Sequence, residues 1–324
     1  MLTRAIIRNY CGLREVDTEL KPVTVLIGPN DSGKSTFLKA LALPFSAQQP
    51  TLHIDSLSHW KGTPSYAVSL TLERASGGEP FVVQRPDRRG DVVTYERKPY
   101  PPGLRAWLIE LPAFGPAMQS PGVPEHVGIP ELDPQAGNFP ALLDLLLRLH
   151  RQRFNELERA ACQQIPGLEQ ISVATPDPNT RRIDFRFQSD FVLPAARASV
   201  GARLILFFLT LAYHPKPPDL LLVEEPENGV HPKRLADILK LLRGIAKGEH
   251  CGHPAQVILS THSPYLLDHV NLDEDQVLVF QRESDGARNC HPIDRAGLKD
   301  FLDDFMLGEV WFNEGEERLV QRGS

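Results

Sequence analysis

The sequence predicts an α/β protein, because short apolar runs of strand length alternate with helical patterns along the chain. Residues 23–27 read Val-Thr-Val-Leu-Ile and precede a helical pattern over 34–43. Residues 220–223 form a second apolar run, and a helical stripe of apolar residues follows over 232–247. Strands that alternate with helices in this way are typical of a sheet with parallel strands.

The rest of the pattern adds an antiparallel part and a helical part to this sheet. Short strand-like pieces at 66–72, 81–84 and 91–95 are separated by Gly, Pro and Asp and predict an antiparallel meander. Prolines crowd residues 99–140, which therefore predict irregular linking structure. Apolar spacing over 141–163 predicts one amphipathic helix, with room for a single break. The other predicted elements are strands at 182–188, 256–260 and 276–281 and helices at 204–213 and 294–305.

The composition indicates the cellular compartment of the protein, but it does not indicate what the protein binds. The 324 residues are 41% hydrophobic, which is enough for a sizeable core, and no apolar run reaches the length of a membrane span. The four scattered cysteines do not form a disulfide framework, so we expect a cytoplasmic protein with no membrane partner. A formal net charge of −6 neither supports nor excludes DNA as a partner.

The most specific motif is GPNDSGKST at residues 28–36, which fills every fixed position of a phosphate-binding loop. Glycines let such a loop fold around an anion with its N–H groups pointing inward, at the start of the next helix. Lys34 then reaches the β- and γ-phosphates, and the Ser35 hydroxyl ligates Mg²⁺. The alternative is a glycine-rich turn, but the flanking strand and helix patterns favour a nucleotide. The candidate binding residues are Gly28, Pro29, Asn30, Asp31, Ser32, Gly33, Lys34, Ser35 and Thr36.

Two adjacent carboxylates, Glu224 and Glu225, follow the apolar run at 220–223. In a phosphate-loop NTPase one such acid joins the Mg²⁺ shell and a second polarises the attacking water. Successive residues leaving a strand point in different directions, so a tandem pair suits both roles. An acidic turn exposed to solvent is the alternative, which the upstream phosphate-loop motif disfavours.

His262 lies just beyond the predicted strand at 256–260, in the segment STHSPYLLD. A lone histidine is more often structural than functional. At a strand end of the same parallel sheet, however, it is placed to contact the γ-phosphate or to hold the attacking water.

With these three motifs in this order, the sequence resembles the ABC-type ATPase heads of the OLD-like AAA-family ATPases, relatives of the SMC heads. The segments IIRNYCGLREVDTELKPVTVLIGPN and GNFPALLDLLLRL extend the resemblance over nearly the whole chain, and EEPENGVHP is its most specific part. The resemblance implies a P-loop fold of ABC/SMC-head type with a mixed central sheet, an antiparallel β subdomain and a helical insertion. It also implies one domain over 1–324, with an N-terminal lobe (1–120), a helical insertion (121–190) and a C-terminal lobe (191–324).

The same resemblance implies roles for individual residues. Glu224 takes the Walker B position, where transporters carry Asp, and Glu225 is the catalytic base. His231 is at the D-loop position and His262 is the switch histidine. A signature segment, ARASVGARLILFFL, places Ser199 and Gly201 against the phosphates of a second subunit; this match is degenerate, and a helix start in an ordinary loop is the alternative.

By resemblance, the expected protein is an ATPase that uses ATP and Mg²⁺ and forms an ATP-dependent homodimer. Its expected role is in phage defence or DNA maintenance, where it controls a separate nuclease or toxin, because the sequence after His262 leaves no room for a Toprim nuclease domain. Two alternatives stay open: a nucleotide-occupied scaffold whose hydrolysis is incidental, and a structural protein that binds DNA.

Two further sequence signals are weaker and leave their alternatives open. Either Gln48 or Gln49 is a candidate Q-loop glutamine, and nothing in the sequence selects one. Basic residues of the meander form either a patch that faces nucleic acid or, more simply, a solvated hairpin rim. They are Arg85, Arg88, Arg89, Arg97 and Lys98.

Overall fold

The computed structural model describes residues 1–42, 45, 69–74, 81–84, 88–89, 92–93, 96–97, 104–123 and 131–320. They divide into two compact units, of which the first comprises Met1–Leu108, Pro218–Glu224 and Gln256–Ser324 and the second Ile109–Pro217 and Glu225–Ala255. Each unit is therefore assembled from separate stretches of the chain. The expected division into consecutive segments (1–120, 121–190 and 191–324) stays a prediction.

The main sheet has eleven strands in the order β8-β5-β4-β1-β2-β17-β16-β3-β15-β14-β9. Its first half is formed by β1 (Leu2–Tyr10), β2 (Leu13–Glu19), β4 (Ser69–Arg74), β5 (Phe81–Gln84), β8 (Glu96–Arg97) and β17 (Arg288–Pro292). Its second half is formed by β3 (Val23–Ile27), β9 (Ala106–Glu110), β14 (Leu220–Glu224), β15 (Gln256–Ser260) and β16 (Gln276–Arg282). A separate pair joins β6 (Arg88–Arg89) to β7 (Val92–Val93).

The parallel centre of this sheet is built around β3. β3 pairs in parallel with β15 on one side and with β16 on the other, and β15 pairs in parallel with β14. Every residue of β3 and of β15 is buried, which accounts for their mainly apolar sequences. The predicted mixed sheet of P-loop type is thus confirmed.

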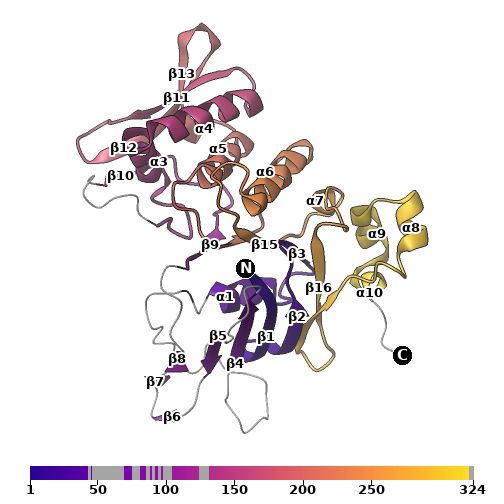
Figure 1. The fold of residues 1–324 in the computed structure, drawn as a ribbon. Helices are drawn as coiled ribbons and strands as arrows, with labels where there is room; N and C mark the ends of the chain where they lie inside the picture. The colour runs from indigo at the N-terminus through magenta and orange to yellow at the C-terminus, as the bar shows by residue number, and fades with distance from the viewer. Residues whose placement is uncertain are drawn as a thin grey trace. The chain divides into compact units, whose positions relative to one another are not determined.

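The antiparallel strands β1, β2, β4 and β5 belong to this same main sheet. β1 pairs antiparallel with β2 and with β4, and β4 pairs antiparallel with β5 (Figure 1). In β2, buried residues such as Val16 alternate with exposed ones, as one-sided burial requires. The strand expected at 91–95 is shorter and pairs with β6, outside the main sheet.

The helices of the first unit are α1 (Lys34–Ala42), α7 (Pro264–Leu267), α8 (Lys299–Asp304), α9 (Leu307–Glu314) and α10 (Glu316–Leu319). Phe37, Leu38 and Leu41 form one buried face of α1, and the Phe37 ring meets the Phe280 ring edge-on at 5.4 Å between centroids. The helix expected at 294–305 starts later, at Lys299, because the Asp294 carboxylate accepts the Gly297 N–H at 3.0 Å and holds a turn there.

The second unit combines helices with a small antiparallel sheet. Its helices are α3 (Phe139–Leu149), α4 (Arg151–Gln164), α5 (Val200–Ala212) and α6 (Leu235–Lys247), which lie beside one another in Figure 1. Its strands are β10 (Gln119–Pro121), β11 (Leu168–Ala174), β12 (Thr180–Phe187) and β13 (Phe191–Pro194). The helix predicted at 141–163 is broken once, at His150. The segment expected as a helical insertion thus also contributes strands β11 and β12.

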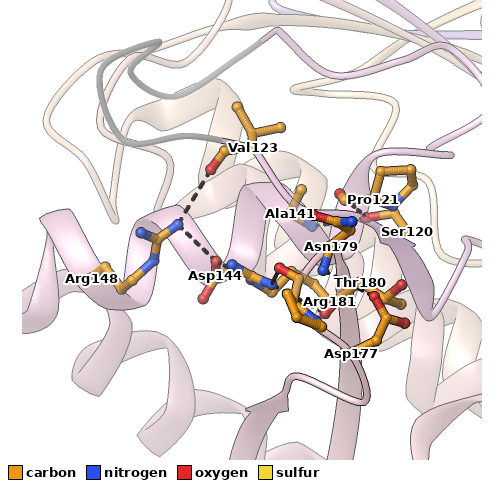
Figure 2. Close-up of polar contacts among 11 residues, drawn as sticks. Ser120, Pro121, Val123, Ala141, Asp144, Arg148, Asp177, Asn179, Thr180 and Arg181 are labelled. Carbon is orange, nitrogen blue, oxygen red and sulfur yellow. Dashed lines mark hydrogen bonds and ion pairs between the residues drawn. The ribbon is translucent and has the colours of Figure 1, made fainter.

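A buried carboxylate ties α3 to this small sheet, as Figure 2 shows. Asp144 accepts hydrogen bonds from Arg148 Nη2 and from Arg181 Nε of β12, both at 2.8 Å. Its side chain is almost inaccessible to solvent, so the two guanidinium groups balance a charge that water cannot reach. Ser120 of β10 adds a contact, because its Oγ accepts the Ala141 N–H of α3 at 3.2 Å.

In the described part of the second unit, short 3₁₀ turns lie at Gln188–Asp190, Ala195–Arg197 and Pro232–Arg234. The last of these precedes α6, so the helix predicted from residue 232 begins as a tighter turn. Within the ranges that the structure describes, no helix combines the length and the hydrophobicity needed to cross a bilayer.

The packing of α9 on α7 depends on Gly308. A Cβ at this position would overlap the Pro264 carbonyl oxygen, and the Gly308 N–H donates to Asp268 Oδ1 at 2.9 Å. We expect Gly308→Ala to lower the free energy of unfolding by about 1–3 kcal/mol, the usual cost of overpacking. Chemical denaturation followed by circular dichroism measures this change.

Gly201→Ala is the matched control, because a Cβ added to this residue of α5 would have no other atom within 4 Å. There alanine should stabilise the helix by about 0.4–1 kcal/mol. Equal effects of the two substitutions would contradict the assigned packing of α9.

Candidate functional site

The loop between β3 and α1 has the backbone shape that its glycines permit. Gly28 and Gly33 have φ values of 138° and 106°, and Asp31 adopts the left-handed region at 61°. A Cβ at Gly28 would overlap the carbonyl oxygen of Phe280. Only glycine fits at that position, so the loop can approach the neighbouring strand closely.

Lys34 is buried at the start of α1, and its ammonium group turns back into the loop. Lys34 Nζ donates to the carbonyl oxygens of Gly28 and Pro29 at 2.9 Å and 2.8 Å. Ser32 is also buried, whereas Ser35 is exposed in the first turn of α1. The structure therefore gathers a cation, a helix N-terminus and an accessible hydroxyl in one loop, a donor set that suits a polyphosphate with Mg²⁺.

Strand register brings three of the predicted motifs to one edge of the sheet. Leu26 of β3 is aligned with Ser260 of β15, which is aligned with Glu224 of β14. The Thr261 N–H also donates to the Leu26 carbonyl at 2.9 Å. Because neighbouring strands lie about 4.8 Å apart, Glu224 ends its strand about 10 Å from the end of β3. The 28–36 loop and His262 follow at the same edge.

Glu225, the first residue of the second stretch of the second unit, has a strained backbone. Its φ is 43°, a region that costs a non-glycine residue about 1–3 kcal/mol. Asn228 stabilises it twice, because Asn228 Nδ2 donates to Glu225 Oε2 at 2.8 Å and the Asn228 N–H donates to the Glu225 carbonyl at 3.1 Å. The side chain of the predicted base is thus held in a defined turn.

The second unit brings Ser199, Gly201 and His231 together around one cavity of about 480 Å³. Ser199 caps α5, with its Oγ accepting the Ala202 N–H at 3.2 Å. His231 Nδ1 accepts the Lys233 N–H at 3.3 Å. Residues predicted from two different motifs therefore line the same hollow, together with the side chains of Arg197 and Arg234.

One residue of this region is absent from the sequence predictions: Arg288 of β17. Its Nε donates to the Asp31 carbonyl and its Nη2 to Asp31 Oδ1, both at 2.6 Å. The Arg288 N–H also donates to the Gly12 carbonyl at 3.0 Å. Arg288 thus connects the β1–β2 turn to the phosphate loop. No sequence signal pairs it with Asp31, which lies 257 residues earlier in the chain.

Several candidates lie outside the described residues or show only their backbone. Gln48, Gln49, Arg85 and Lys98 lie outside the described residues. Arg88, Arg89 and Arg97 are in strands whose side chains are not described. The Q-loop and basic-patch predictions therefore stay predictions.

Comparisons with protein families and with single proteins agree with the nucleotide site that the geometry indicates. Residues 1–72 match the family described as "AAA ATPase domain", and residues 125–268 match "AAA domain, putative AbiEii toxin, Type IV TA system". An OLD nuclease of Thermus scotoductus is 22% identical over an alignment of 363 residues, which covers 95% of this chain and 68% of that protein.

Solved structures support the fold. The SMC head domain from Thermotoga maritima superposes with a TM-score of 0.54 at 14% identity, over 90% of this chain and 99% of that one. The Smc head of Pyrococcus furiosus, solved with an extended coiled coil and bound to the C-terminal domain of ScpA, gives a TM-score of 0.58 at 11% identity. That match covers 94% of this chain and 98% of the other. The fold is therefore that of an SMC-type head.

Because Arg288 holds Asp31 at two points, we expect Arg288→Ala to loosen the phosphate loop. The dissociation constant for ATP, measured by calorimetry, should rise about three- to tenfold, as expected for loss of a partly exposed ion pair and its hydrogen bonds. If Arg288 acts through Asp31, the double variant Arg288→Ala with Asp31→Gly should bind ATP only slightly more weakly than Arg288→Ala alone.

Arg282→Ala provides the control, since it removes an exposed guanidinium at the end of β16, with no contact to Asp31 among those described. An equal loss of affinity in both variants would mean that general charge, not the bracing of Asp31, sets the effect.

Proposed function

We propose that this chain binds and hydrolyses ATP at the 28–36 loop, because it is similar to AAA ATPase domains and to an OLD nuclease and has the fold of an SMC head. The observation that carries this proposal is the aligned register of Leu26, Ser260 and Glu224. It supports one site at which the loop, the carboxylate and the residues after β15 serve the same triphosphate.

Each residue has a separate task in this proposal. Lys34 and the loop N–H groups bind the β- and γ-phosphates, and His262 contacts the γ-phosphate. Ser35 and Glu224 would hold Mg²⁺, which neutralises charge on the transferred phosphoryl group. Glu225, the next residue along the chain, accepts a proton from the attacking water.

We further propose that a second copy of the chain completes the site. The shared cavity of Ser199, Gly201 and His231 supports this idea, because the N-terminus of α5 opens at that cavity and the positive end of a helix favours a phosphate. ATP would then join two subunits head to tail, and hydrolysis would release them.

The wider role is proposed by analogy with the relatives. The chain would act in the cytoplasm as an ATP-switched subunit in phage defence or DNA maintenance, and it would control a separate nuclease or toxin and contact DNA. The relative from Thermus scotoductus is itself called a nuclease, and that name describes the longer protein.

The first test separates ATP binding from hydrolysis. Lys34→Ala should abolish ATP binding in calorimetry, because the buried ammonium is lost from the loop. Glu225→Gln should keep binding and lower the phosphate-release rate by about 10²–10⁴-fold, the usual contribution of a general base. If Glu225→Gln hydrolyses ATP at the parent rate, the assignment of the base is wrong. If its biological activity persists without hydrolysis, the scaffold alternative is favoured.

The second test asks whether two copies share a site. A Cβ at Gly201 would have no other atom within 4 Å, so Gly201→Asp should be accommodated, and it places a negative charge at the start of α5, where it repels a triphosphate. Lys34→Ala and Gly201→Asp should each be inactive, whereas an equal mixture should recover about a quarter of the parent rate, because half of its dimers hold one intact composite site.

A mixture that stays inactive, although mass measurement shows mixed dimers, would refute the head-to-tail arrangement. Glu225→Gln alone should also shift from monomer to dimer on adding ATP, as light scattering coupled to gel filtration would show.

A further inference from the structure

α7, α9 and the link before α9 expose several large apolar side chains, and α7 packs against α9. Tyr265 of α7 is 60% exposed, Phe305 and Met306 between α8 and α9 are 52% and 53% exposed, and Phe312 of α9 is 77% exposed. We call these four residues the C-terminal apolar patch. Exposed apolar side chains that gather on a folded surface mark an interaction site more often than single ones do.

The contacts of α9 hold the patch together. Gly308 lies against Pro264, the neighbour of Tyr265, and its N–H donates to Asp268 at 2.9 Å. Phe312 follows Gly308 by one helical turn and therefore lies on a neighbouring part of the same helix surface. Phe305 and Met306 form the short link between the end of α8 and the start of α9.

The patch is not needed to anchor these helices. Leu307, Val310 and Trp311 of α9 are buried, and the Trp311 indole N–H donates to Glu316 at 3.1 Å. Phe312 lies outside this buried stripe, so the core keeps its own apolar residues. The phenyl ring of Phe312 is therefore mostly exposed to solvent.

Carboxylates lie within two residues of the patch members in the sequence. Asp303, Asp304 and Glu314 are exposed, and within the described part of the chain none of them forms an ion pair. Glu309 Oε2 accepts the Met306 N–H at 3.0 Å, which places another acid beside the patch. The basic residues near them on these helices are fewer, namely Lys299 and Arg318, and the guanidinium of Arg318 stacks on the Phe301 ring at 4.4 Å.

We propose that the C-terminal apolar patch docks an amphipathic segment of a different protein, one whose apolar residues are flanked by Lys or Arg. Apolar side chains of the partner would cover Phe312 and Met306, and its cations would pair with Asp303, Asp304 and Glu314. A second copy of the same acidic patch, an anionic membrane and a nucleic acid all carry the wrong charge for this surface.

This interaction surface does not depend on the ATPase proposal. The patch residues lie outside the predicted nucleotide site, so patch variants should keep the parent ATPase rate. A failure of the docking test therefore leaves the nucleotide chemistry untouched, and the reverse also holds.

The test uses the full chain and a fluorescent helical peptide with leucines on one face and lysines on the other. Fluorescence anisotropy should show saturable binding that weakens as salt is raised. Phe312→Ser should weaken binding about tenfold or more, as loss of a central aromatic contact does. Combined Asp303→Asn and Asp304→Asn should weaken it less, and mainly at low salt.

Phe191→Ser is the matched control, because Phe191 of β13 is 58% exposed and lies in the second unit. It should leave peptide affinity unchanged, and a peptide with glutamates in place of lysines should not bind. Unchanged melting temperatures would show that the variants remain folded.

Three results would overturn the proposal. Equal losses for Phe312→Ser and Phe191→Ser would show non-specific adhesion, and equal binding of the glutamate peptide would exclude charge recognition. Self-association that Phe312→Ser abolishes, seen by analytical ultracentrifugation without peptide, would make a second copy the occupant instead.

Discussion

The hydrogen-bonded register around β3 is the constraint on which the candidate site depends. β3 pairs with β15 on one side and with β16 on the other, and β15 also pairs with β14. Parallel strands all end at the same edge, so one set of backbone bonds places the phosphate loop, Glu224 and the segment with His262 together. A shift of one residue in any strand would turn its side chains to the opposite face and remove its polar group from this edge.

Backbone conformation supplies a second level of control. Asp31 and Glu225 are non-glycine residues in the left-handed region, at φ values of 61° and 43°. Each is held by specific side chains, Arg288 in the first case and Asn228 in the second. Strain that persists because neighbours stabilise it is typical of functional positions, where a fixed geometry matters more than local stability.

Local patterns in the sequence were sufficient to predict the parallel centre. The apolar runs of β3, β14 and β15 reflect burial on both faces, and GPNDSGKST requires its own backbone shape. Long-range pairings were not predictable: Arg288 meets Asp31 through a contact that no local pattern encodes. The small sheet of the second unit was largely missed, because its strands β11 and β12 are partly polar and only one apolar–polar alternation, at 182–188, stood out.

The strand order also has a consequence for synthesis on the ribosome. The side chain of Gln256 forms hydrogen bonds with the backbone N–H and the backbone carbonyl of Leu2, 254 positions earlier in the chain. Both neighbours of β3, namely β15 and β16, are likewise synthesised long after β3 itself. At translation speeds of about 5–20 residues per second, the first strands spend about 13–50 s without those partners. During this interval the β1–β2 hairpin can form alone, while the apolar edge of β3 remains open to chaperones.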